Sequence, residues 1–202
     1  MKDSTNALVT LSARNAMLVV VHPHNNECCS VNGKGTAETE AAIDRIVQIV
    51  PRFRAAGMPV RFTFAAAAHN DAFKAFGGVH PKIAALITKD DRLHQEYNAN
   101  AYVSASFRAE LMAGLPRHHF LVGFNLSDCV SKTAIGGMHD KDLRVQSMTI
   151  LSDAAADRAD IAMDQMRDDS GIGESLISAM ARASGVEKTR STIVMARLGI
   201  AA

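Results

Sequence analysis

Cys129 is the side chain in this sequence whose position best suits nucleophilic chemistry. It follows the apolar segment 119–123, which predicts a buried strand, and Ser127 and Asp128 before it predict the start of a helix. Free amides and the positive dipole end at a helix N-terminus stabilise a thiolate and could hold an oxyanion. Asp128 opposes the first effect, because a nearby negative charge raises a thiol pKa. A small buried hydrophobic cysteine is the alternative interpretation.

Two histidines follow the first predicted strand. His22 and His24 are two residues apart, so in an extended chain they share a face. His22 could be the general base for Cys129, because an imidazole titrates near neutral pH. Alternatively, the two histidines could bind zinc together with His69 or His80. Histidines that make ordinary loop hydrogen bonds are the third interpretation.

Several common catalytic and nucleotide-binding motifs are absent. The chain has no Walker loop, no complete GxGxxG after a strand, no GxSxG, no HExxH and no CxxC. Nucleotide chemistry is therefore unsupported. The adjacent Cys28 and Cys29 are interpreted as loop residues without a role.

Short apolar runs alternate with segments of helical periodicity, which is typical of βαβ units. We expect a Rossmann-like three-layer α/β/α fold with a mostly parallel sheet of about six strands and right-handed crossovers. Ligands bind at the carboxyl ends of such strands, here after Val21, Phe64 and Gly123. The expected strands are 17–21, 59–64, 119–123, 148–151 and 192–195, and the expected helices include 36–56, 104–112 and one within 171–183.

The helix expected over 36–56 has clear boundaries in the sequence. Thr36 is its expected N-cap and Gly57 its expected C-cap. Pro51 lies inside this pattern and lacks an amide proton, so we expect it to kink or divide the helix.

Composition places the chain among ordinary globular proteins. Its 202 residues are 48% hydrophobic and 21% charged, which predicts a single domain over 1–202. A net charge of +1 leaves no excess of positive charge that would favour binding to nucleic acid or an anionic membrane. Residues 1–5 do not resemble a secretory signal, and three cysteines, two of them adjacent, suit a reducing compartment. We therefore expect a cytoplasmic protein.

Five segments between residues 15 and 157 resemble the isochorismatase-like cysteine hydrolases. Residues 17–25 are similar to the family's first strand and the polar residues after it, and 54–60 to its R-x-x-G-x-P-V turn. Residues 120–130 resemble the segment that carries the nucleophile, and 152–154 match its S/T-D-A. Residues 100–102 resemble an N-A-W stretch of small bacterial members that form large rings.

The resemblance implies a catalytic triad of Asp, Lys or Arg, and Cys. Cys129 stands at the position of the cysteine and His22 at that of the aspartate. The basic position falls on Gln95, or on Arg92 or Lys89 after a short insertion. A non-proline cis peptide bond is also implied shortly before the cysteine, between residues 125 and 126.

A substrate-binding set and an oligomeric state also follow from the resemblance. The fold and Cys129 together favour a hydrolase that cleaves a small amide or related carbon–nitrogen bond, with His22 as base. A non-catalytic protein that binds a small molecule or a protein partner in the same pocket is the first alternative, and the histidine metal site is the second. We expect no cofactor or metal in the leading case, and a homo-oligomer. The expected substrate-binding residues are His24, Asn98, Asn100, Tyr102, Asn125 and Leu126.

Overall fold

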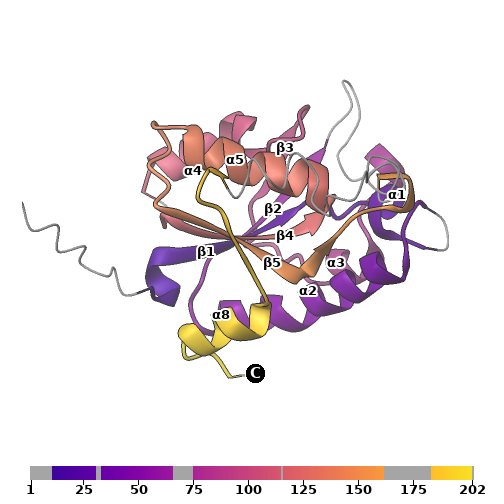
Figure 1. Cartoon of the computed structure of the whole chain (residues 1–202), viewed down its shortest axis with the longest axis horizontal. Helices are drawn as coiled ribbons and strands as arrows, with labels where there is room; N and C mark the ends of the chain where they lie inside the picture. Colours follow the sequence, from indigo (N-terminus) through magenta and orange to yellow (C-terminus); the bar gives the residue numbers. More distant parts are fainter. Residues whose placement is uncertain (1–10, 31–32, 66–74, 115, 162–182, 202) are drawn as a thin grey trace, which may run out of the picture.

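The computed structural model describes residues 11–30, 33–65, 75–114, 116–161 and 183–201, and the expected helix within 171–183 and His69 lie largely or wholly outside them. Six strands in the described ranges form one parallel sheet in the order β3-β2-β1-β4-β5-β6 (Figure 1). The strands are β1 (Ala16–Val21), β2 (Val60–Ala65), β3 (Leu93–Glu96), β4 (His118–Phe124), β5 (Ser147–Ala156) and β6 (Glu187–Thr189).

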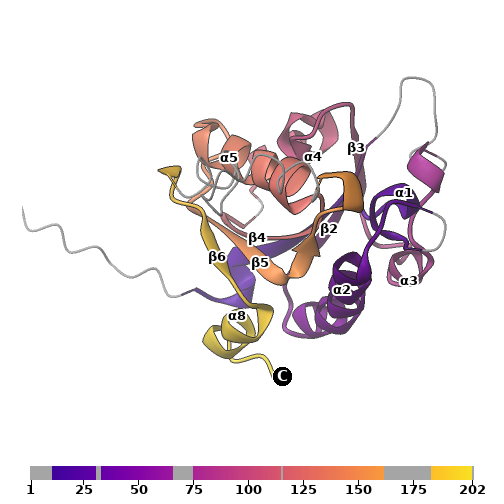
Figure 2. The same ribbon diagram turned by 45° about the vertical axis from the view of Figure 1, so that its right-hand side comes forward.

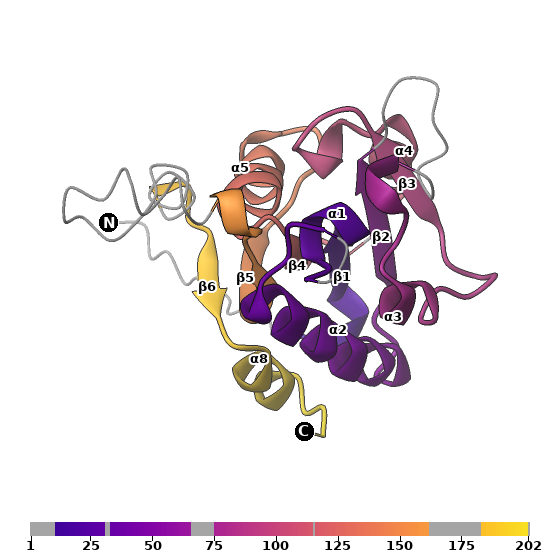
Figure 3. The same ribbon diagram turned by 90° about the vertical axis from the view of Figure 1, so that its right-hand side faces the viewer.

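Helices cover both faces of the sheet, which confirms the predicted three-layer α/β fold. α2 (Ala37–Ala55), α3 (Pro81–Ala84) and α8 (Ser191–Arg197) lie on one face, and α4 (Ala105–Met112) and α5 (Ser131–His139) on the other (Figure 2). The short helix α1 (Asn25–Cys28) follows β1 and lies near the end of the sheet (Figure 3).

β1 is buried along its whole length, because both its faces are covered. Alternate side chains pack on opposite layers: Leu18 and Val20 join the core with α2, whereas Met17, Val19 and Val21 join the core with α4 and α5. β1 therefore lies at the centre of both cores, and the residues that follow it are held on a rigid element.

α2 begins where the sequence predicts. The Thr36 side chain accepts a hydrogen bond from the Thr39 amide at 3.3 Å, and Gly57 follows the helix with a φ of +80°. Pro51 was expected to kink or divide the helix, and the expectation of division is wrong. α2 continues through Pro51, because the proline costs one backbone bond while Val50 and Phe53 on either side remain buried against the sheet.

Two sheet-edge elements differ from the sequence-based expectation. Residues 192–195 belong to α8 rather than to a strand, because Val194 and Met195 are buried while Ile193 is 45% exposed. The edge strand next to β5 is the polar β6, and the opposite edge strand, β3, has no apolar run that would predict it.

In the ranges that the structure describes, no helix combines the length and the apolar character needed to span a lipid bilayer.

Candidate active site

A pocket of about 240 Å³ lies beyond the carboxyl ends of the central strands. This is the edge of a parallel α/β sheet where ligands bind. Segments that follow β1, β2, β3, β4 and β5 all contribute to its wall. The lining residues are His22, Glu27, Ala65, Phe76, Tyr97, Asn98, Ala99, Asn125, Asp128, Cys129, Arg158 and Ile161.

Cys129 lies in the wide turn of residues 126–130 between β4 and α5. The amides of Asp128 and Val130 both donate to the carbonyl oxygen of Asn125, at 3.2 and 2.9 Å, and the Ser127 amide donates to Asp157 at 2.9 Å. These three amides are therefore engaged within the protein and are not available to an oxyanion.

The cis peptide bond implied by the resemblance is present one residue earlier than expected. It joins Phe124 and Asn125, so the prediction of a bond between Asn125 and Leu126 is wrong. The difference places the bond at the last residue of β4, where the chain leaves the sheet.

The surroundings of Cys129 favour the neutral thiol. Burial raises its pKa to about 12, and the charge of Asp128 adds to the rise, while a hydrogen bond from the Asn125 backbone works against it. Asp128 also lies 3.6 Å from the sulfur and pairs with Lys132 at 2.5 Å. The negative neighbour and burial therefore outweigh the helix N-terminus at this thiol.

His22 is held at the end of β1 by a partner from a strand that is not adjacent. Its Nε2 is hydrogen-bonded to Oε1 of Glu96, the last residue of β3, and both side chains are buried. His22 has a φ of +47°, the left-handed conformation that a residue other than glycine seldom adopts. Backbone and side chain together fix the direction of the ring.

Burial sets the protonation of this pair. Burial lowers the pKa of His22 to about 4, although the negative charges of Glu27 and Asp128 act to raise it. Burial also raises the pKa of Glu96 to about 9. Oε2 of Glu96 has no hydrogen-bond partner among the described residues, which suits a protonated carboxyl. Both side chains therefore favour their neutral forms at pH 7.

A second polar network forms another part of the pocket wall. Nη1 of Arg158 contacts both carboxylate oxygens of Glu27, at 2.8 and 2.9 Å, and the Asn125 side-chain amide donates to Glu27 at 2.7 Å. The Asn125 side-chain oxygen accepts from the Arg158 backbone at 2.9 Å. The largely buried carboxylate is thus charge-paired and hydrogen-bonded.

The structure brings several of the residues expected from the sequence into one pocket. His22, Asn98, Asn125 and Cys129 all line it. Gln95 does not, because side chains alternate along β3 and Gln95 is exposed where Glu96 is buried.

The two alternatives for the basic position also lie outside the lining. Arg92 is an exposed side chain that pairs with Glu110 at 2.9 Å, and Lys89 is exposed.

Four other expected residues lie outside the lining as well. Tyr102 is buried in the core, where its hydroxyl bonds Nδ1 of His119 at 2.5 Å, and the Asn100 side chain accepts from the Tyr102 amide at 2.9 Å. His24 is fully buried beside Phe64, and Leu126 lines a different pocket, at the start of α2.

Two polar residues of the site, Glu96 and Arg158, were not predicted from the sequence. Glu96 can be recognised as a buried residue only once β3 is known to be a strand, because alternate side chains of a strand lie on the same face. Arg158 could have been found as a positively charged residue that closely follows the S-D-A segment 152–154, which lies within β5. Neither belongs to the pattern that the resemblance implies.

The histidine metal site proposed as an alternative is not formed by His22, His24 and His80. The ring centres of His22 and His24 are 6.3 Å apart, whereas His80 lies with Cys29 and Glu40. Within the described ranges, the latter three are the group close enough to share a metal ion.

Comparisons with known proteins support the fold assignment. No family model and no curated protein matches the sequence. Solved structures do match. A cysteine hydrolase from Pseudomonas syringae pv. phaseolicola is 16% identical with a TM-score of 0.69, and the match covers 93% of this chain and 94% of that chain. N-carbamoylsarcosine amidase from Thermoplasma acidophilum is 19% identical with a TM-score of 0.64, covering 88% and 96%.

A ribonuclease from Caenorhabditis elegans is also similar, with 14% identity, a TM-score of 0.68 and coverage of 93% and 83%. Isochorismatase family proteins are also among the matched structures, so the chain has the isochorismatase-like fold. Because a ribonuclease and an amidase are both among the similar structures, the fold alone does not identify a reaction.

Proposed function

We propose that the chain is a cysteine hydrolase that cleaves a carbon–nitrogen bond in a small amide, with Cys129 as nucleophile and His22 as general base. The observation that carries the proposal is the shared pocket of Cys129 and His22, in which Glu96 holds the imidazole. A nucleophile, a base and a third group that orients the base are the elements that covalent catalysis needs.

The reaction follows from these groups. His22 takes the thiol proton, the sulfur attacks the amide carbonyl carbon, and the carbon–nitrogen bond breaks as His22 returns the proton to the leaving nitrogen. Water then hydrolyses the thioester, which releases the acid and restores the thiol. The pocket volume of about 240 Å³ favours a small substrate.

The hydrogen bond to Glu96 restricts which form of His22 can act as base. With Nε2 bonded to Glu96, Nδ1 is the ring nitrogen that remains for the thiol. Nδ1 accepts a proton only when the neutral ring carries its own proton on Nε2, and Oε1 of Glu96 accepts that hydrogen bond whether Glu96 is ionised or carries its proton on Oε2. Ionised Glu96 is the stronger acceptor and makes Nδ1 more basic, so with the pKa of Glu96 raised to about 9 we expect the rate to increase with pH towards that value.

The test uses p-nitrophenyl acetate, an activated acyl donor that requires no knowledge of the substrate. We expect acetylation of Cys129, detected by mass spectrometry, to be slower in His22→Ala by about a hundredfold or more. Gln95→Ala is the matched control, since Gln95 lies on β3 outside the pocket. Equal acetylation of wild type and His22→Ala would rule out His22 as the base.

One observation favours the second candidate, a non-catalytic binding protein. The raised pKa of Cys129, to about 12, describes a thiol that is not activated in the free protein. A small molecule that binds equally to wild type and Cys129→Ala, with no acetylation of wild type by the probe, would select this candidate.

We also propose that the chain forms a homo-oligomer. Tyr97 beside the pocket is 72% exposed and Val103 is 47% exposed, which suits coverage by another subunit. Light scattering at micromolar concentration should give at least a dimer; a monomer would contradict the proposal.

A further inference from the structure

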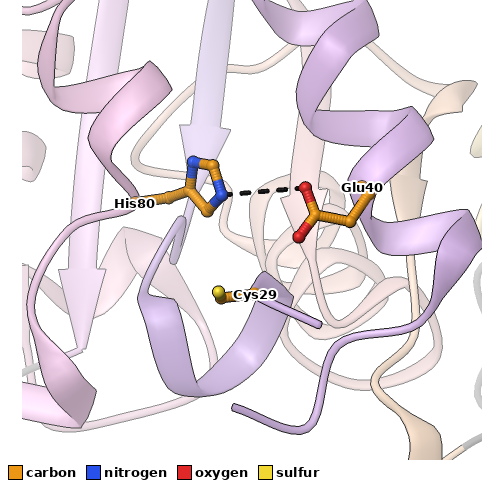
Figure 4. Close-up of side chains that lie close together, drawn as sticks. All are labelled: Cys29, Glu40 and His80. Carbon is orange, nitrogen blue, oxygen red and sulfur yellow. Dashed lines mark ion pairs between the residues drawn. The ribbon is translucent and has the colours of Figure 1, made fainter. Parts of the chain in front are cut away.

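A second group of reactive side chains lies outside the pocket, where α1, α2 and α3 meet (Figure 4). Cys29 is the C-cap of α1, Glu40 lies in the first turn of α2, and His80 is the N-cap of α3. One sulfur, one carboxylate oxygen and one ring nitrogen lie within 4.8 Å of one another. Segments up to 51 residues apart in the chain thus supply three different ligand types.

The spacing of these atoms is close to that of a tetrahedral metal site. Zinc bonds of about 2.0 Å to nitrogen and oxygen put two such ligands about 3.3 Å apart at the tetrahedral angle. Nε2 of His80 lies 3.8 Å from Oε2 of Glu40, so a shift of about half an ångström reaches that value. Thiolate, imidazole and carboxylate are all zinc ligands.

Surrounding contacts position two of the three residues. Oε1 of Glu40 accepts from the amide and the hydroxyl of Ser30, both at 3.0 Å, while Oε2 faces His80. His80 is only 5% exposed, and its backbone amide donates to the Pro23 carbonyl at 2.9 Å. Such supporting contacts orient ligands before a metal binds.

Binding through Nε2 has one identifiable cost. Nδ1 of His80 accepts from the Lys82 amide at 3.3 Å, and a ring that binds metal through Nε2 carries its proton on Nδ1. That bond is long and therefore weak, so its loss is a small cost against three new metal–ligand bonds.

We propose that Cys29, Glu40 and His80 form a binding site for zinc or a similar transition-metal ion, with a fourth position for water. On binding, the metal replaces the thiol proton of Cys29, which is released to solvent. The proposal gives Cys29 a role that the sequence did not indicate, and it places a metal where the leading interpretation of the sequence expected none.

The position of the site also indicates what the ion does. α1 carries Glu27, which lines the pocket, and its C-cap Cys29 belongs to the proposed site. An ion bound to Cys29, Glu40 and His80 ties α1 to α2 and α3. We therefore assign it a structural role in fixing the short helix that presents Glu27.

Cobalt(II) is the probe that tests the site directly. Added to the metal-free full chain, it should give a thiolate-to-cobalt absorption band and the intense visible bands of a four-coordinate ion. Calorimetry with zinc should show about one equivalent per chain. Cys29→Ala should abolish the thiolate band, and Glu40→Gln and His80→Gln should each weaken zinc binding by more than about tenfold.

Two matched controls identify the cysteine. Cys28→Ala and Cys129→Ala remove the other thiols, neither of which belongs to the group, and both variants should retain the band. Absence of the band in wild type, or its persistence in Cys29→Ala, would overturn the proposal. Circular dichroism of Cys29→Ala distinguishes loss of the ligand from loss of the fold. If Cys29→Ala does not fold, the loss of zinc affinity in Glu40→Gln provides the test.

Discussion

His22 and Glu96 share a hydrogen bond although their strands are not neighbours: β2 lies between β1 and β3 in the sheet. The two side chains meet beyond the carboxyl end of β2. The family resemblance implies an acid after the first strand and a basic residue further along the chain. Here an imidazole follows β1 and a carboxyl ends β3, so acid and base occupy the opposite positions.

The first prediction concerns stability between pH 6.5 and 9. Glu96 keeps its proton in the folded protein up to about pH 9 but loses it near pH 4.5 when unfolded. The unfolded chain therefore binds fewer protons in this window, and the free energy of unfolding should fall as pH rises, by at most about 1.4 kcal/mol per pH unit. Below pH 6.5, His22 has the opposite effect, because its folded pKa is lowered to about 4.

Urea unfolding at several pH values checks this prediction. Glu96→Gln should flatten the slope between pH 6.5 and 9. Glu187→Gln, which alters an exposed carboxyl paired with Arg197, should leave it unchanged. A slope that survives in Glu96→Gln would show that another group is responsible.

The second prediction concerns the reactivity of Cys129. Burial and Asp128 raise the pKa of the thiol, and Asp128→Asn removes the second cause. The variant also releases Lys132 from its ion pair, which adds a positive charge near the sulfur. Alkylation by iodoacetamide at pH 8 should become several-fold faster in Asp128→Asn. Asp142→Asn, at a 79% exposed side chain, should match wild type; an unchanged rate in both variants would contradict the role of Asp128.

The third prediction concerns the ion pair in the pocket wall. Arg158→Ala leaves the largely buried Glu27 without its cation and should reduce the free energy of unfolding by about 2 kcal/mol. Glu27→Gln combined with Arg158→Ala should recover part of the loss, because no unpaired charge remains. Thermal unfolding of the two variants checks this, and a double variant less stable than Arg158→Ala would count against it.

The fourth prediction compares two glycines that share a positive φ. At Gly123, with φ +117°, a Cβ would lie 2.0 Å from the carbonyl oxygen of Val21, so Gly123→Ala should abolish folding. At Gly57, with φ +80°, a Cβ meets nothing within 4 Å, so Gly57→Ala should cost only about 1 to 2 kcal/mol of backbone strain. Soluble yield and thermal unfolding measure the difference; a stable Gly123→Ala protein would show that β1 and β4 can separate there.

The fold was more accessible from the sequence than the site, for a physical reason. Central strands such as β1 and β4 are buried on both faces, so their residues must form continuous apolar runs that can be read directly. Edge strands carry no such requirement. β3 and β6 contain mostly polar side chains, and both escaped prediction.

The missed edge strand also explains the misplaced site residue. Reading back along the sequence without gaps reaches Gln95, but burial of one face of β3 selects Glu96. A shift of one residue reverses which side chain points inward. Position in the chain alone could not distinguish them, because both residues are polar and adjacent.

The parallel sheet has a consequence for attaching labels to this protein. The six described strands all run the same way, so the segment 140–146, which leads into β5, lies at the rim opposite the pocket. Lys141 in that segment is exposed. A fluorophore or a surface tether at Lys141 would thus leave the approach of small molecules to Cys129 unobstructed, and the thiol could be assayed on an immobilised protein.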